Sequence, residues 1–273
     1  MSSQVADTVR IREYAVHRAL APYVKCIWSL ESDGPISGAG RERILPDSCV
    51  ELVFHFHDPY RTHFANGESA LQPRSFVVGQ MKRFLEIEPA GRAGFLAVRF
   101  HARGAYLFFH RPLREVAAGV VDLEDLWRDR AREWTERIAL ATGMGARVRF
   151  VERALLALLG ERSRTELAVD RALQIIEASG GQIRVDDLAA EIGVSCRNLT
   201  RLFERAVGLS PKEFGRVSRF LRALRLLTAG DHRSLTDVAL DCGFFDQAHF
   251  NHDFRELAGM SPGDLSTFPN VSF

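Results

Sequence analysis

The C-terminal third of the chain contains one sequence pattern twice, and this repeat constrains the fold more than any other feature. The two copies occupy residues 185–203 and 235–254. In each copy a short helical stretch with an internal alanine is followed by a glycine, then by Ser195 or Asp246, then by a second helical stretch. Glycine ends helices, and Ser or Asp caps the start of the next one. The pattern therefore predicts two helix-turn-helix units in tandem, with the small alanine allowing close packing of the two helices in each unit.

The helix expected to begin at Cys196 has an apolar face and a basic face. Apolar side chains recur at the helical spacing of three and four residues, as Leu199, Leu202 and Phe203 do. The opposite face is expected to contact double-stranded DNA, through Arg197, Thr200, Arg201 and Arg205. Arginine bonds guanine and phosphate in a bidentate manner, so this face fits direct contact with bases.

Basic residues are concentrated in and after this helix. Residues 195–225 contain eight arginines and lysines against Glu204 and Glu213, a local charge of +6 in a chain of net charge +1. Such a concentration predicts phosphate binding, with roughly six to eight phosphates neutralised and a slope of log K against log salt of about −5 to −7. The helix expected over 212–229 is about 27 Å long. This length suits a connector between two DNA-contacting helices that lie about one turn of DNA apart.

The second unit has a different charge balance. It offers four residues for DNA contact, namely Gln247, Asn251, His252 and Arg255. Gln and Asn can pair with adenine edges, while a histidine of ordinary pKa, about 6.5, is a weak phosphate ligand at pH 7. Asp246 is expected to act as a helix cap, but the sequence indicates no role within the protein for Asp253. We therefore expect the second unit to be the weaker reader.

The motif residues within 188–203, 237–254 and 259–262 resemble the DNA-binding domain of AraC/XylS-type transcription regulators, and this resemblance covers residues 166–273. Segment 45–54 resembles the amino-terminal domain of one branch of that family. The resemblance implies a β-rich regulatory domain joined to a two-part DNA reader that acts on a promoter or operator. It also implies a small-molecule effector or protein contacts at the regulatory domain, a homodimer, and RNA polymerase as a partner in activation.

The N-terminal part has the residue pattern of strands. Segments 50–56, 75–78, 83–87 and 94–100 are short, rich in β-branched and aromatic residues, and separated by Gly and Pro. Short strands at this spacing predict a barrel or sandwich. We expect an α+β chain of two domains, with a β-rich regulatory domain over 1–115, a helical dimerisation or linker region over 116–165, and an all-α DNA-binding domain over 166–273.

A small-molecule site is expected in the regulatory domain. Aromatic residues and polar side chains on the expected strands suggest an effector-binding set, namely Trp28, Phe54, Phe56, Arg99 and His101. Aromatic residues at strand spacing also form ordinary cores, which is the structural alternative for three of these five.

A metal-dependent cupin-like enzyme or sensor in the N-terminal domain is the alternative function. His55 and His57 are expected on one strand face, followed by His63, Glu68, His101 and His110. However, no glutamate lies three or four residues after His57, so the full cupin spacing is missing. We assign no catalytic residue, metal ligand or cofactor on this basis.

Composition excludes several other classes. Hydrophobic residues make up 46% of the chain and charged residues 26%, as in globular domains. The N-terminus lacks the apolar segment of a secretory signal, so a cytoplasmic protein is expected. The four cysteines are scattered without a Cys-x-x-Cys pair, which favours free thiols over a zinc site or an alkylation-repair centre.

Overall fold

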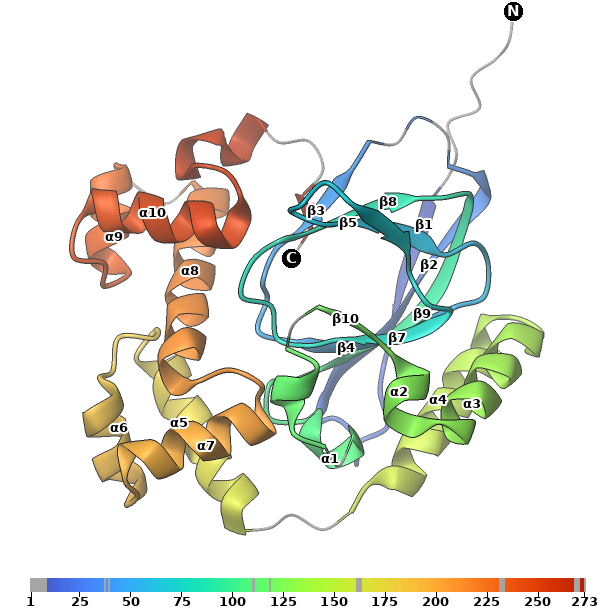
Figure 1. Cartoon of the computed structure of the whole chain (residues 1–273), viewed down its shortest axis with the longest axis horizontal. Helices are drawn as coiled ribbons and strands as arrows, with labels where there is room; N and C mark the ends of the chain where they lie inside the picture. Colours follow the sequence, from blue (N-terminus) through green and yellow to red (C-terminus); the bar gives the residue numbers. More distant parts are fainter. Residues whose placement is uncertain are drawn as a thin grey trace, which may run out of the picture.

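The computed structural model describes residues 9–36, 38, 40–109, 111–117, 119–160, 164–230, 234–267 and 271–272. Apart from Val271–Ser272, the described strands lie within residues 9–122, and helices predominate after them. Figure 1 shows the strands in one body and the C-terminal helices in another beside it. The expected two-domain α+β fold is thus confirmed, with a β-rich N-terminal part and a helical C-terminal part.

Two sheets form the N-terminal domain. The six-stranded sheet runs in the order β1 (Val9–Tyr14), β2 (Val24–Pro35), β9 (Arg92–Phe100), β4 (Val50–His55), β7 (Ser75–Val78) and β10 (Val120–Asp122). The five-stranded sheet runs in the order β11 (Val271–Ser272), β3 (Glu42–Ile44), β8 (Leu85–Pro89), β5 (Tyr60–His63) and β6 (Ser69–Leu71). Pairing is antiparallel except between β11 and β3, where the C-terminal strand adds in parallel to the sheet edge.

The six-stranded sheet is covered on both faces, and strand alternation assigns each side chain to one of them. On β4, Leu52 and Phe54 belong to the core beneath the helices. The intervening residues Glu51, Val53 and His55 line a cavity that faces the other sheet. The near-continuous apolar run of this strand follows from this burial on both sides.

Three helices cover the outer face of the six-stranded sheet (Figure 1). They are α2 (Leu123–Trp127), α3 (Asp129–Leu140) and α4 (Met144–Leu158), and they follow the short helices α1 (Tyr106–Phe109) and η1 (Leu113–Glu115). Trp134 of α3 packs on Phe54, with ring centroids 6.3 Å apart. Residues 123–158, for which a dimerisation or linker role is expected, therefore complete the core of the N-terminal domain.

The C-terminal domain consists of helices within residues 164–267. The all-α expectation over 166–273 was wrong at its end, because β11 (Val271–Ser272) pairs with β3 in a sheet of the N-terminal domain. The helices are α5 (Arg164–Ala178), α6 (Val185–Ile192), α7 (Cys196–Ala206), α8 (Pro211–Ala229), α9 (Leu235–Asp241), α10 (Gln247–Ala258) and η2 (Pro262–Thr267). In Figure 1, α8 runs between a group formed by α5–α7 and a group formed by α9 and α10. Its first turn has a capping box of Ser210 and Glu213, with Pro211 at the first helical position. This long helix therefore connects the two expected units.

Local sequence signals place both turns where the repeat predicts them. Gly193 ends α6 in the left-handed conformation with φ of +76°, which glycine adopts without a steric cost. The Ser195 side chain then accepts a hydrogen bond from the Asn198 amide, and Asp246 accepts one from the His249 amide. Both expected helix caps are confirmed.

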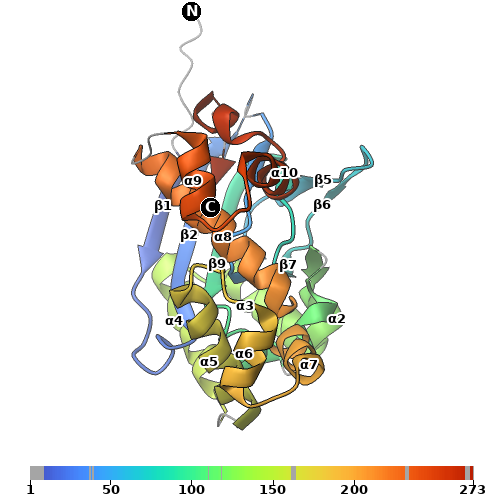
Figure 2. The same cartoon turned by 90° about the vertical axis from the view of Figure 1, so that its left-hand side faces the viewer.

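The two domains are in direct contact. Figure 2 shows the C-terminal helices lying across the front of the strands. Lys82 and Glu213 form an ion pair at 2.8 Å, and the guanidinium of Arg43 donates to the carbonyls of Ala258 and Gly259. The end of α10 is therefore anchored to β3. Among the described helices none is long and apolar enough to span a membrane.

Candidate DNA-binding surface and N-terminal cavity

The second helix of the first unit, α7, presents a basic exposed face. Leu199 and Phe203 are buried in the core of the domain, while Arg197 and Arg201 are exposed. Arg201 donates to the side-chain oxygen of Asn198 at 2.9 Å, which orients its guanidinium along the helix. The two arginines are thus available to a duplex laid against this face.

The other two residues expected to bind DNA on α7 have partners in the protein. The hydroxyl of Thr200 donates to the backbone carbonyl of Cys196. Arg205 donates through Nε to the hydroxyl of Tyr106 at 2.7 Å, and its guanidinium lies 5.5 Å from the centre of that ring. Because Tyr106 is on α1, Arg205 joins the first unit to the N-terminal domain.

The second helix of the second unit, α10, carries polar side chains. His252 and Arg255 are exposed, while Gln247 accepts a hydrogen bond from Thr236 at 2.6 Å. Asn251 is half-buried, and its side-chain oxygen has no hydrogen-bond partner among the described residues. These four residues come from one helix, but only His252 and Arg255 among them are exposed to a ligand.

Asp253 has a structural role that the sequence did not indicate. Its side chain is buried, and Oδ1 lies 2.9 Å from the guanidinium of Arg216 on α8. Arg216 also pairs with Glu256 on the next turn of α10. Burial opposes the charged form of Arg216, but these two carboxylates outweigh it and raise its pKa. The acidic residues at this position hold α10 to α8, so Asp253 has a role within the protein after all.

Fewer basic side chains are available to phosphate than the eight that residues 195–225 contain. Arg216 is paired within the protein, and Arg219 donates to the carbonyl of Gly181 at 2.9 Å. The guanidinium of Arg219 lies over the ring of Phe244, and burial lowers its pKa. Two of the eight basic residues are therefore structural, because α8 is buried on the side that faces α10 and α5.

The described histidines of the alternative function do not come together. Strand β4 ends at His55, so His57 does not share its strand face and that expectation was wrong. The Nε2 atom of His55 bonds Gln72, and that of His63 bonds Glu88. His110 lies outside the described residues.

Within the described part of the chain, the side chains close enough to share a metal ion are His252, Asp253 and Glu256. The guanidinium of Arg216 already supplies a cation to both of these carboxylates. All four cysteines are free, as expected, and they are divided between the two domains.

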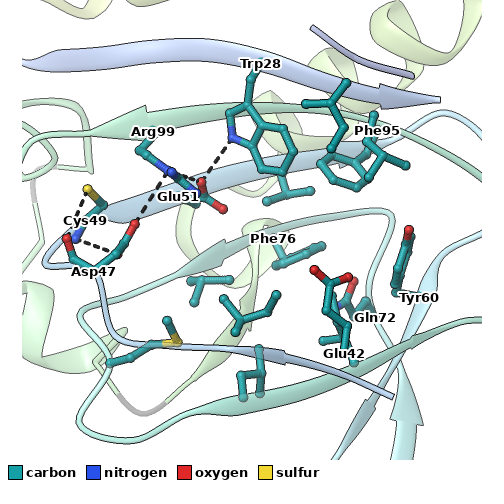
Figure 3. A pocket seen from close by; sticks show the side chains of 18 of the residues that line it. Trp28, Glu42, Asp47, Cys49, Glu51, Tyr60, Gln72, Phe76, Phe95 and Arg99 are labelled. Atoms are coloured by element: carbon teal, nitrogen blue, oxygen red, sulfur yellow. Dashed lines mark hydrogen bonds and ion pairs between the residues drawn. The ribbon is translucent and has the colours of Figure 1, made fainter. Parts of the chain in front are cut away.

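A cavity of about 330 Å³ lies between the two sheets (Figure 3). At one end, the Nε of Arg99 lies 2.6 Å from Glu51 and 3.6 Å from Asp47, and Trp28 donates its indole N–H to Glu51 at 3.1 Å. Burial disfavours the charged guanidinium, but the two carboxylates prevail and raise the pKa of Arg99. This end of the cavity thus has a fixed ion pair.

The five residues of the expected effector set divide among three places. Trp28 and Arg99 line the cavity, whereas Phe54 and Phe56 lie in the core on the opposite face of the six-stranded sheet. His101 lines a separate cleft between the two domains, which Asp47 and Cys49 also border. Phe54, Phe56 and His101 are therefore not part of the proposed effector site.

Several cavity residues were missed by the analysis of the sequence. They include Glu42, Tyr60 and Gln72, which Figure 3 shows at the end opposite Arg99. Strand alternation was the available signal, because it places Glu51, Val53 and His55 on one face of β4 and Phe54 on the other. The contribution of the second sheet required the tertiary structure.

The chain matches two family models. Residues 12–122 match a family described as "Domain of unknown function (DUF6597)". Residues 188–267 match a family described as "Helix-turn-helix domain". The second match contains α7, α10 and the connector between them.

Curated relatives share the helical part. Over 80 residues the chain is 36% identical to the HTH-type transcriptional activator RhaS of Klebsiella pneumoniae, which covers 29% of this chain and 28% of that protein. Over 82 residues it is 38% identical to the HTH-type transcriptional regulator GbdR of Pseudomonas aeruginosa, covering 30% and 22% respectively. The chain therefore spans less than a third of the length of these relatives.

Among solved structures, a probable AraC family transcriptional regulator from Rhodopseudomonas palustris is similar in sequence to the helical part. The sequence identity is 34%, and the match covers 36% of this chain and 92% of that chain with a TM-score of 0.33.

Proposed function

Residues 188–267 form a helix-turn-helix domain of the AraC type, and on this premise we propose that the chain is a sequence-specific, DNA-binding transcription regulator. The observation that carries the proposal is the pair of capped helices α7 and α10, joined by the 19-residue helix α8. We propose that they enter two successive major grooves of one duplex. Contacts would come from Arg197, Thr200, Arg201 and Arg205 on α7, and from Gln247, Asn251, His252 and Arg255 on α10.

A selection of genomic fragments with the full-length protein tests this proposal. We expect a small set of fragments to be retained, and to give a mobility shift that an excess of unrelated DNA does not remove. Arg201→Ala is expected to abolish the specific shift. Arg137→Ala is the matched control, because Arg137 is exposed on α3 and pairs with Glu133, away from the helices of the reader. Retention of fragments without any shared sequence would contradict specific recognition.

The N-terminal cavity supports regulation by a small molecule. Glu42 and Ile44 of β3 line the cavity, while Arg43, between them, holds the carbonyl groups at the end of α10. A single strand therefore has a cavity wall on one face and a contact to the second recognition helix on the other. We propose that a ligand which displaces β3 changes the position of α10 and hence the affinity for DNA.

The remaining expectations follow from this role. RhaS is named a transcriptional activator, and we propose that this chain also acts on transcription through RNA polymerase, as a homodimer. Binding rather than catalysis is its proposed activity, and a DNA reader works where the DNA is, in the cytoplasm. Sedimentation of the protein with and without its selected fragment measures the oligomeric state.

A further inference from the structure

We infer that Phe245 reads DNA through an apolar contact with the 5-methyl group of a thymine, in the half of the site that the second unit binds. This inference rests on the proposed function and adds a base-reading residue to it. Three observations support it: the exposure of Phe245, its place at the free end of α10, and the engagement of the two amide oxygens that would otherwise read adenine.

Phe245 is a large apolar side chain that lies in water at the turn of the second unit. It is 85% exposed, whereas its neighbour Phe244 is buried and packs on Phe250, with ring centroids 5.1 Å apart. The backbone on either side is fixed, because Gly243 adopts the left-handed conformation with φ of +77° and Asp246 caps α10. Single apolar side chains are common on protein surfaces, so the meaning of this one depends on where it lies.

Phe245 lies at the N-terminal end of a recognition helix. Ala248 and His252 follow at intervals of three and four residues and are exposed, so they continue one face of α10 from this end. The N-terminal domain holds the opposite end of the helix, where Arg43 donates to the last two carbonyls. Because α10 has 12 residues and is about 18 Å long, Phe245 is well away from that contact. In a helix-turn-helix unit, the N-terminal residues of the recognition helix are the ones that reach base edges.

The two side chains of α10 that could read adenine have their amide oxygens engaged or buried. A Gln or Asn reads adenine by accepting from its amino group while donating to its N7. The amide oxygen of Gln247 already accepts from the hydroxyl of Thr236 at 2.6 Å. The amide oxygen of Asn251 is buried. Neither residue can form the two-bond pair in this arrangement, although a single hydrogen bond from Gln247 remains open. An apolar contact is thus the base contact that this end of α10 offers.

Thymine is the base that fits an exposed phenylalanine, because its 5-methyl group lies in the major groove. None of the other three bases presents a methyl group there, and Phe and Ala are side chains that contact it. Ala248, in the first turn of α10, is exposed and small, so it extends the apolar surface without holding the base away. The carboxylate of Asp246 accepts from the amide of His249 at 2.7 Å and is therefore bonded within the turn. Contact between the ring and the methyl group removes both from water, which is favourable.

Replacement of thymine by deoxyuridine removes only this methyl group and so tests the inference. Each thymine of a selected fragment is replaced in turn, and fluorescence anisotropy measures the affinity of the full-length wild type and of Phe245→Ala. At one or more thymines in one half of the site, the wild type should lose about fourfold in affinity, the value of one buried methyl group. Phe245→Ala should bind the unmodified fragment about fourfold or more weakly than the wild type, and should lose nothing further at the same thymine.

Leu140→Ala is the matched control, because Leu140 is 82% exposed on α3, which Figure 1 shows on the far side of the molecule from α10. This variant should keep the wild-type affinity and the same loss at the same thymine, and melting temperatures show that both variants are folded. A fragment without any such thymine, or an equal loss in Phe245→Ala and the wild type, would overturn the inference. Unchanged DNA binding by Phe245→Ala would also overturn it and would assign the exposed ring to a protein partner.

The same measurements separate this inference from the proposed function. Specific binding of the wild type without a methyl effect that depends on Phe245 refutes the inference alone. Failure of the wild type to select fragments with a shared sequence refutes the proposed regulator, and the inference with it.

Discussion

Arg216 on α8 and Asp253 on α10 form an ion pair, with 2.9 Å between the guanidinium and Oδ1, and the Asp253 side chain is 9% exposed. The pair joins the connector to the second recognition helix. Glu256 contacts the same guanidinium. Acidic residues that looked unsuited to a DNA reader are therefore part of the contact that orients α10.

Asp253→Ala should destabilise the protein by about 1–3 kcal/mol, because it leaves Arg216 half-buried with a single carboxylate. The lower end is expected, since the Arg216 side chain is 29% exposed and solvent reduces the cost. Urea unfolding measures the change. Asp241→Ala, at an exposed position on α9, is the control, and an equal loss in both variants would show that the ion pair contributes nothing.

Tyr106→Phe should raise the affinity for the selected DNA by about two- to fivefold. This substitution removes the hydroxyl that accepts from Arg205 and keeps the ring beneath it. A hydrogen bond of this kind is worth about 1 kcal/mol net, and its loss frees Arg205 for phosphate. Fluorescence anisotropy with labelled DNA measures the affinity. Unchanged or weaker binding would mean that the Arg205–Tyr106 contact does not restrain the reader.

The salt dependence of DNA binding should be shallower than the number of basic residues in 195–225 implies. With Arg216 and Arg219 engaged inside the protein, about four to six of the expected six to eight phosphates remain to be neutralised. The slope of log K against log salt is then expected at about −4 to −5. Titrations between low and moderate salt give this slope directly. A slope of −6 or steeper would show that the two arginines leave their partners when DNA binds.

Stability should fall as the pH is lowered from about 6.5 to about 4, in part because of His55. Burial depresses the folded-state pKa of this residue to about 4, below its unfolded value of about 6.5. The unfolded chain therefore takes up the proton first, and up to about 3 kcal/mol of stability is lost as pH falls through this window. Urea unfolding at several pH values should show a smaller fall in His55→Gln than in the wild type. His252→Gln, at an exposed position, should match the wild type.

The helical domain was predictable because its signals are local. Gly193, Ser195 and Asp246 fix turns and caps within a few residues of chain, and the repeat made them recognisable. The apolar stripe of α7 follows from the helical period alone. The presence of two successive helix-turn-helix units was therefore predictable from the spacing of the cap, turn and apolar residues.

The role of individual charges was not predictable, because it depends on contacts between distant segments. Asp253 finds Arg216 across the interface of α8 and α10, and Arg205 finds Tyr106 across 99 residues of chain. The residues that line the cavity were not predictable for the same reason. Its wall includes Glu42 from a second sheet, and the choice between Phe54 and its neighbours depends on which face of β4 each residue occupies.

The two recognition helices are expected to contribute unequally. Arg201 on α7 is exposed and oriented by Asn198, and a bidentate arginine–guanine contact gives about 1–3 kcal/mol of discrimination. His252 on α10 is exposed but has no such orienting bond to a carbonyl or amide oxygen among the described contacts. Loss of Arg201 should therefore affect recognition of the whole site, and loss of His252 one half of it.

Footprinting of wild type, Arg201→Ala and His252→Ala on the same selected fragment tests the central claim that α7 and α10 read DNA as two unequal units. We predict two protected segments about one helical turn apart for the wild type, no specific protection for Arg201→Ala, and weakened protection of one segment for His252→Ala. Equal losses in the two variants, a larger loss from His252→Ala, or a single protected segment in the wild type would contradict the account.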